Sequence, residues 1–136
     1  MDLLDPKNDF VFKKIFSQAL DLLCDLINAV RDDHPTITEI EVLNSTIKPQ
    51  KLTGKHIILD LLAQDVQGKR YKVEMQIRKY NVWSSRSTCY LARMLTEQLS
   101  SGEDYRQLKP AIGIHLLGFS LFDQPEHQNQ AVCVLK

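Results

Sequence analysis

The chain has 136 residues, of which 43% are hydrophobic and 25% are charged, as is typical of one soluble globular domain. Its 17 basic and 17 acidic side chains balance, no apolar run reaches 18 residues, and the N-terminus is acidic. These features exclude a disordered tail, a coiled coil, a membrane span and a secretory signal. Three widely spaced cysteines indicate free thiols, so we expect a single cytoplasmic domain over residues 1–136.

The balanced total conceals an uneven distribution of charge. Residues 1–68 carry 7 basic and 11 acidic side chains, and residues 69–109 carry 9 basic and 4 acidic side chains. A basic segment can contact phosphates, because neutralising them releases counterions. An ordinary solvated surface of mixed charge explains the same distribution.

The N-terminal part of the chain predicts a helix over residues 9–31. Asp9 is the expected N-cap, and Ser17 allows a break into segments 10–16 and 18–31. The apolar side chains recur at steps of three or four residues, which gives the helix one apolar face. They are Phe12, Phe16, Leu20, Leu23, Ile27 and Val30.

Three strands are predicted next, over residues 37–44, 56–65 and 69–78. The first and third alternate apolar and polar side chains, whereas the second is a nearly continuous apolar run. The segment 65–68 between the last two strands ends in Gly68 and is typical of a tight turn. These two strands are therefore expected to form an antiparallel hairpin.

The rest of the chain predicts one helix and one strand. A helix over residues 84–101 is expected to end at Gly102, and a buried strand follows Pro110. After residue 123 the sequence becomes polar. The order helix, strand, strand, strand, helix, strand predicts an α/β fold with a mixed sheet.

The most informative residue is Asp60, a carboxylate inside the apolar second strand. Burying an isolated carboxylate is costly, so it requires a partner, a proton or a metal. In the hairpin, residues whose numbers add up to about 133 or 134 face each other, so Asp60 is expected opposite Glu74, with Gln76 on the same face. A divalent cation would relieve the repulsion between the two acids. A bulge at Gly68 would instead separate them.

Asp60, followed after 13 residues by Glu74-Met75-Gln76, resembles the core motif of the PD-(D/E)XK nucleases, with Gln76 in place of the usual lysine. The segments KNDFVFKKIF, GKHIILDLLAQDVQGKRYKVEMQ and SRSTCYLARMLTEQLSSGEDYRQLKPAIGIHLL are similar, in order, to the transposase and recombination-promoting nuclease branch of that family. The resemblance covers a core of about residues 5–122. It implies a restriction-endonuclease-like αβββαβ core with a mixed central sheet flanked by helices.

The resemblance also implies roles for individual residues. Asp60 and Glu74 match the metal-binding carboxylates, the backbone carbonyl of Met75 is a third ligand, and Gln76 completes the catalytic set. Because Gln76 is neutral, it can orient water or phosphate only by hydrogen bonds, and the identity of the general base stays open. Four further residues match active-site or DNA-contacting positions: Asp9, Lys13, Arg86 and Tyr90.

The function implied is a DNA endonuclease that uses Mg²⁺, for which Mn²⁺ can substitute, and that takes part in transposition or recombination. One alternative is a non-catalytic member of the same fold that binds DNA or regulates a relative. As a partner, such a protein would pair with a second copy or with a longer family member. Another alternative is an interaction module whose buried acids are neutral or ion-paired with Lys72 or Arg78.

Overall fold

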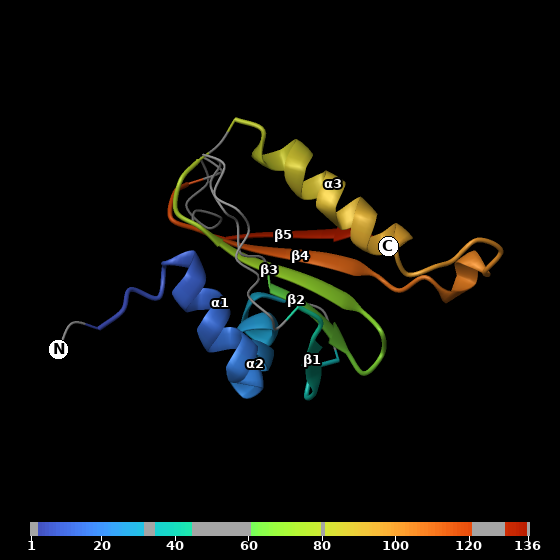
Figure 1. Ribbon diagram of the computed structural model, residues 1–136, viewed down its shortest axis with the longest axis horizontal. Helices are drawn as coiled ribbons and strands as arrows, with labels where there is room; N and C mark the ends of the chain where they lie inside the picture. The colour runs from blue at the N-terminus through green and yellow to red at the C-terminus, as the bar shows by residue number, and fades with distance from the viewer. Residues whose placement is uncertain (1–2, 32–34, 45–60, 80, 121–129, 136) are drawn as a thin grey trace.

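The computed structural model describes residues 3–31, 35–44, 61–79, 81–120 and 130–135. Within them, a mixed sheet has the strand order β1-β2-β3-β4-β5, and only the β3–β4 pair is parallel. Helices α1 and α2 cover one face of the sheet and α3 covers the other (Figure 1). The elements are α1 (Asp9–Gln18), α2 (Leu20–Val30), β1 (Ile40–Val42), β2 (Leu61–Asp65), β3 (Arg70–Gln76), α3 (Trp83–Thr96), a 3-10 turn (Tyr105–Gln107), β4 (Ala111–Leu117) and β5 (Gln130–Leu135). The α/β fold class predicted from the sequence is confirmed.

The N-cap of helix α1 lies one residue earlier than expected. The side chain of Asn8, rather than that of Asp9, accepts hydrogen bonds from the backbone N–H groups of Phe10 and Val11, at 3.0 and 3.3 Å. The break between the two helices lies at Ala19, whose φ of −103° and ψ of 81° are not helical. Ser17 stays within α1. The predicted split of the helix is therefore confirmed, but its cap and its break point are displaced.

The hairpin of β2 and β3 has the predicted register. In every described pair, from Leu61 with Val73 to Gln64 with Arg70, the residue numbers add up to 134. The turn depends on Gly68, which has a φ of 83° that favours glycine and whose N–H donates to the Asp65 carbonyl at 3.0 Å. The predicted turn is confirmed, and no bulge shifts the register between these pairs. Residues 56–60, including Asp60, lie outside the described residues.

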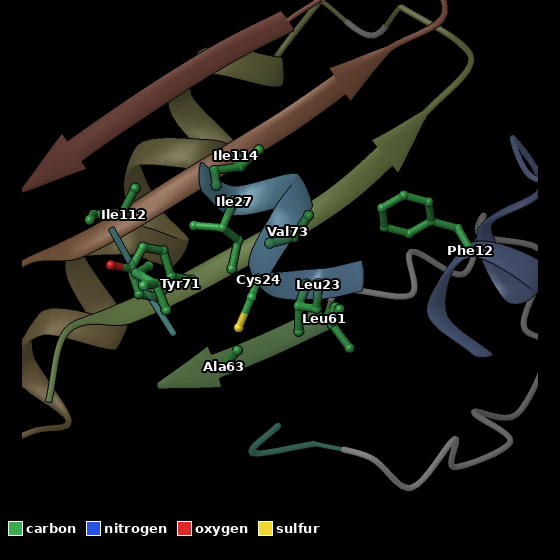
Figure 2. Packing of buried hydrophobic residues seen from close by; sticks show 11 residues of the cluster. Phe12, Leu23, Cys24, Ile27, Leu61, Ala63, Tyr71, Val73, Ile112 and Ile114 are labelled. Carbon is green, nitrogen blue, oxygen red and sulfur yellow. The ribbon is translucent and has the colours of Figure 1, made fainter. Parts of the chain in front are cut away.

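Both faces of the sheet bury apolar side chains. On the face covered by α1 and α2, the largest cluster joins the helices to β2, β3 and β4 (Figure 2). Its members include Phe12, Leu23, Cys24, Ile27, Leu61, Ala63, Tyr71, Val73, Ile112 and Ile114. A smaller cluster on the other face joins α3 to the sheet through Leu91, Met94 and Ala111. The sheet is therefore enclosed on both sides, and polar groups on it can be well buried.

Several element boundaries differ from the sequence prediction. Strand β1 is shorter than 37–44, because the backbone of Ile37 hydrogen-bonds the side chain of Asn28 on α2. Helix α3 ends at Thr96, and Gly102, with a φ of 88°, lies in a later turn. Strand β5 was not predicted at all. It pairs with β4 and forms one edge of the described sheet.

None of the helices in the described part of the chain is long and apolar enough to cross a membrane.

Candidate active site

The site is built on the face of the sheet that α3 covers. Alternation along β3 places Lys72, Glu74 and Gln76 on one face, since side chains two residues apart share a side of a strand. Lys72 is paired with Leu62, which packs against the α3 cluster and so identifies that face. All three polar side chains are buried, with Glu74 only 5% exposed. Buried charges on a sheet require partners, and the neighbouring residues supply them.

The two carboxylate oxygens of Glu74 have different partners. Oε2 accepts a hydrogen bond from the Lys72 ammonium at 2.9 Å, and Oε1 lies 2.6 Å from Nδ1 of His115. His115 lies directly opposite Glu74 in the parallel pairing of β3 with β4. The other ring nitrogen of His115 lies 2.8 Å from the Ser87 hydroxyl on α3. The carboxylate is therefore held in place from two sides.

An aromatic ring and a second cation lie beside this buried pair. The ammonium of Lys72 lies 4.6 Å from the centre of the Tyr90 ring, and the Arg86 guanidinium lies 5.4 Å from the same centre. Both distances suit a cation–π interaction. Tyr90 is 38% exposed and Arg86 is half-buried. Positive charge therefore extends from the carboxylate to the surface of α3.

The residues that follow Glu74 point to opposite faces of the sheet. Gln76 is buried, and its amide nitrogen donates to the backbone carbonyl of Arg78 at 2.9 Å. The side chain of Met75 packs against the cluster under α1 and α2. Of the groups of Met75, the backbone carbonyl and not the side chain is therefore a candidate ligand beside Glu74. The Gln76 amide group has a second N–H and a carbonyl oxygen, so its bond to Arg78 does not prevent it from contacting another group.

The predicted site residues fall into three groups. Glu74, Arg86 and Tyr90 come together through Lys72, as described above. Lys13 is buried on α1, the helix that contacts β2 and β3 on the opposite face of the sheet from α3. Asp9 begins α1, but its side chain and the whole of Asp60 lie outside the described part of the structure.

Sequence reasoning assigned no role to two residues of the site, His115 and Ser87. His115 interrupts the apolar sequence AIGIHLL just as Asp60 interrupts the apolar run over residues 56–65, and that signal could have identified it. Lys72 was considered only as an ion-pair partner of the buried acids, and the structure shows that pairing for Glu74. Ser87 has no distinguishing signal, because α3 contains several serines.

The described donors fit one part of a metal site. A carboxylate oxygen can accept at about two lone-pair positions, so a carboxylate such as that of Glu74 can bind a cation and a hydrogen-bond donor together. Oxygen donors suit a hard cation such as Mg²⁺. Among the described residues, however, no group of three or more His, Cys, Asp and Glu side chains is arranged to hold a metal ion. A site at Glu74 would need a further carboxylate from the part of the chain that is not described.

A mixed sheet flanked by helices, with a buried carboxylate on its central strand, is consistent with the restriction-endonuclease-like α/β fold. Residues 6–136 match the family described as PD-(D/E)XK nuclease family transposase, and the chain belongs to that family. The resemblance inferred from the motif is thereby confirmed. No curated protein and no solved structure matches the chain.

Proposed function

We propose that the protein is a metal-dependent DNA endonuclease, associated with transposition or recombination, that acts as one domain over residues 1–136. The observation that carries this proposal is the register of the β2–β3 hairpin. If the pairing continues by one residue beyond Leu61 and Val73, Asp60 faces Glu74 directly. Opposed side chains on antiparallel strands have Cβ atoms about 4.5–5.5 Å apart, which is close enough to share a cation.

In this proposal, Asp60 and Glu74 hold Mg²⁺ or Mn²⁺ together with the backbone carbonyl of Met75. When bound, such an ion makes water nucleophilic at neutral pH and neutralises charge on a phosphate. Glu74 contributes a carboxylate already oriented by Lys72 and His115. Gln76 orients the attacking water or the scissile phosphate by hydrogen bonds from its amide.

Arg86 on α3 is proposed to bind the DNA backbone. It lies beside the partly exposed ring of Tyr90, where a phosphate can meet its positive charge, whereas Lys72 is buried and paired with Glu74. The same ring offers a face on which a base can stack. Asp9 and Lys13 belong to α1, which covers the opposite face of the sheet from α3, and their contact with the site or with DNA remains a proposal from the family resemblance.

Cleavage of supercoiled plasmid in Mg²⁺, in Mn²⁺ and in EDTA tests the proposal. We expect nicking or linearisation by the wild type in either metal, none in EDTA, and none by Asp60→Ala or Glu74→Gln. Glu97→Gln is the matched control, because Glu97 is an exposed acid paired with Arg93. Cleavage that persists in EDTA, or that survives in both site variants, contradicts the proposal.

Two contacts favour a second candidate, a DNA-binding or regulatory member of the family without catalysis. Glu74 is ion-paired with Lys72, and the amide of Gln76 is directed to a backbone carbonyl. Such a protein would bind DNA, or pair with another copy or a longer relative, and would cleave nothing in any metal. Retained DNA binding without cleavage in Mg²⁺ or Mn²⁺ would favour this candidate.

A further inference from the structure

A chain of hydrogen bonds crosses the site from α3 to β3. It runs from the Ser87 hydroxyl to Nε2 of His115 at 2.8 Å, and from Nδ1 of His115 to Oε1 of Glu74 at 2.6 Å. The three side chains are 4%, 0% and 5% exposed. Each side chain belongs to a different element, so these two hydrogen bonds connect α3 and β4 to the carboxylate on β3.

The direction of these bonds follows from the chemistry of the groups. An ionised carboxylate only accepts hydrogen bonds, so Nδ1 of His115 carries the hydrogen in the contact with Glu74. In a neutral imidazole the other nitrogen is then an acceptor, and the Ser87 hydroxyl donates to it. The serine therefore stabilises the tautomer that the contact with Glu74 requires.

The backbone next to His115 leaves room for this arrangement. A Cβ atom at Gly113 would lie 3.1 Å from Nε2 of His115 and 3.2 Å from both terminal carbons of Leu91. These contacts are tighter than ordinary van der Waals distances. A side chain at position 113 would therefore displace either the imidazole or the helix residue that packs beside it.

We propose that His115 and Ser87 are positioning residues for Glu74 as a metal ligand. His115 fixes the orientation of the carboxylate, and Ser87 fixes the ring and the tautomer of His115. This inference rests on the proposed function of Glu74. Groups that hydrogen-bond metal ligands orient them and tune metal affinity, so their loss is measurable in metal binding. Ser87 is not proposed as a nucleophile, because its hydroxyl is buried against the ring.

Calorimetric titration of the metal-free protein with Mn²⁺ tests the inference directly. We expect His115→Leu to weaken Mn²⁺ binding by about 10–100-fold. His115→Asn should weaken it less, because its amide N–H can occupy the position of the Nδ1–H donor. Ser87→Ala should fall between the wild type and His115→Leu, and Ser85→Ala, an exposed serine of the same helix, should match the wild type.

The titration also separates this inference from the proposed function. If Glu74→Gln abolishes Mn²⁺ binding while folded His115→Leu and Ser87→Ala bind like the wild type, the positioning role is wrong and the metal site stands. If Glu74→Gln itself binds Mn²⁺ like the wild type, the proposed function fails together with the inference.

A spectroscopic measurement on the metal-free wild type does not depend on any variant folding. Nitrogen NMR of the His115 ring should show a hydrogen on Nδ1 and a hydrogen-bonded, unprotonated Nε2 at neutral pH. In Ser87→Ala, the Nε2 resonance should move toward that of a nitrogen without a donor. A hydrogen on Nε2 in the wild type, alone or together with one on Nδ1, would overturn the assignment of Ser87 as the donor to His115.

Discussion

Glu74 and His115 occupy directly opposed positions in the parallel pairing of β3 with β4, and their side chains meet at 2.6 Å. Lys72, two residues before Glu74 on the same strand, binds the other carboxylate oxygen at 2.9 Å. A buried carboxylate is thereby paired with one ammonium and one imidazole. This arrangement holds a carboxylate in one orientation on the sheet, and its partners determine what each substitution costs.

Removing the ammonium should destabilise the metal-free protein. Lys72→Met removes the ammonium that pairs with the buried carboxylate of Glu74, at a cost of about 3–5 kcal/mol in the free energy of unfolding. A divalent cation should recover part of this loss, so the variant should show a larger rise in melting temperature with Mn²⁺ than the wild type. Urea unfolding in EDTA and thermal unfolding with Mn²⁺ measure the two effects.

The control for that variant is Lys79→Met, which changes an exposed lysine just beyond β3 and should shift stability by less than about 0.5 kcal/mol. Equal stability of Lys72→Met and Lys79→Met would mean that the ion pair with Glu74 contributes nothing to the fold.

DNA affinity should depend on Arg86 more than on Arg93. Arg86 lies beside the Tyr90 ring at the site, whereas Arg93 hydrogen-bonds Glu97 at 2.7 Å on the exposed surface of α3. We expect Arg86→Ala to weaken binding and to reduce the slope of log affinity against log salt by about one, because one phosphate contact is lost. Fluorescence anisotropy in EDTA over a series of salt concentrations measures both quantities. Identical slopes for Arg86→Ala and Arg93→Ala would speak against a phosphate at this position.

The two cysteines with described side chains should react at very different rates. Burial raises the pKa of the Cys24 thiol, and the nearby Asp25 and Asp21 raise it further, whereas Cys89 is exposed on α3. A raised pKa reduces the fraction of Cys24 that is thiolate, which is the reactive form. Iodoacetamide should therefore modify Cys89 first, and urea should remove the difference. Equally fast labelling of both peptides in the native protein would show that Cys24 is not buried.

The sequence predicted the parts of the fold that local patterns determine. Gly68 and the alternation of β3 fix the hairpin register, because a one-residue slip would move every apolar side chain to the wrong face. The cap was misplaced because Asn8 and Asp9 are adjacent and both residue types cap helices well. Strand β5 was overlooked because it follows a polar stretch of sequence and lies at the edge of the sheet, next to β4.

The contact of Glu74 with His115 could not be predicted from the sequence for a different reason. It joins residues 41 positions apart and depends on the parallel pairing of β3 with β4 across an intervening helix. Nothing in the periodicity of either strand specifies that register. Glu74 was predictable from the hairpin register and from the motif it forms with Asp60, but its pairing with the imidazole of His115 was not.

The central claim is that Asp60 and Glu74 together bind a divalent cation, and the melting temperature of Asp60→Asn with and without Mn²⁺ tests it most directly. Binding to the folded state alone raises stability by mass action, so the wild type should melt at a higher temperature in Mn²⁺. In Asp60→Asn this rise should vanish, while the metal-free variant should be as stable as the wild type or more stable, because repulsion between the two acids is relieved. A strongly destabilised metal-free Asp60→Asn with an undiminished response to Mn²⁺ would contradict the account, because Asp60 would then serve the fold and not the metal.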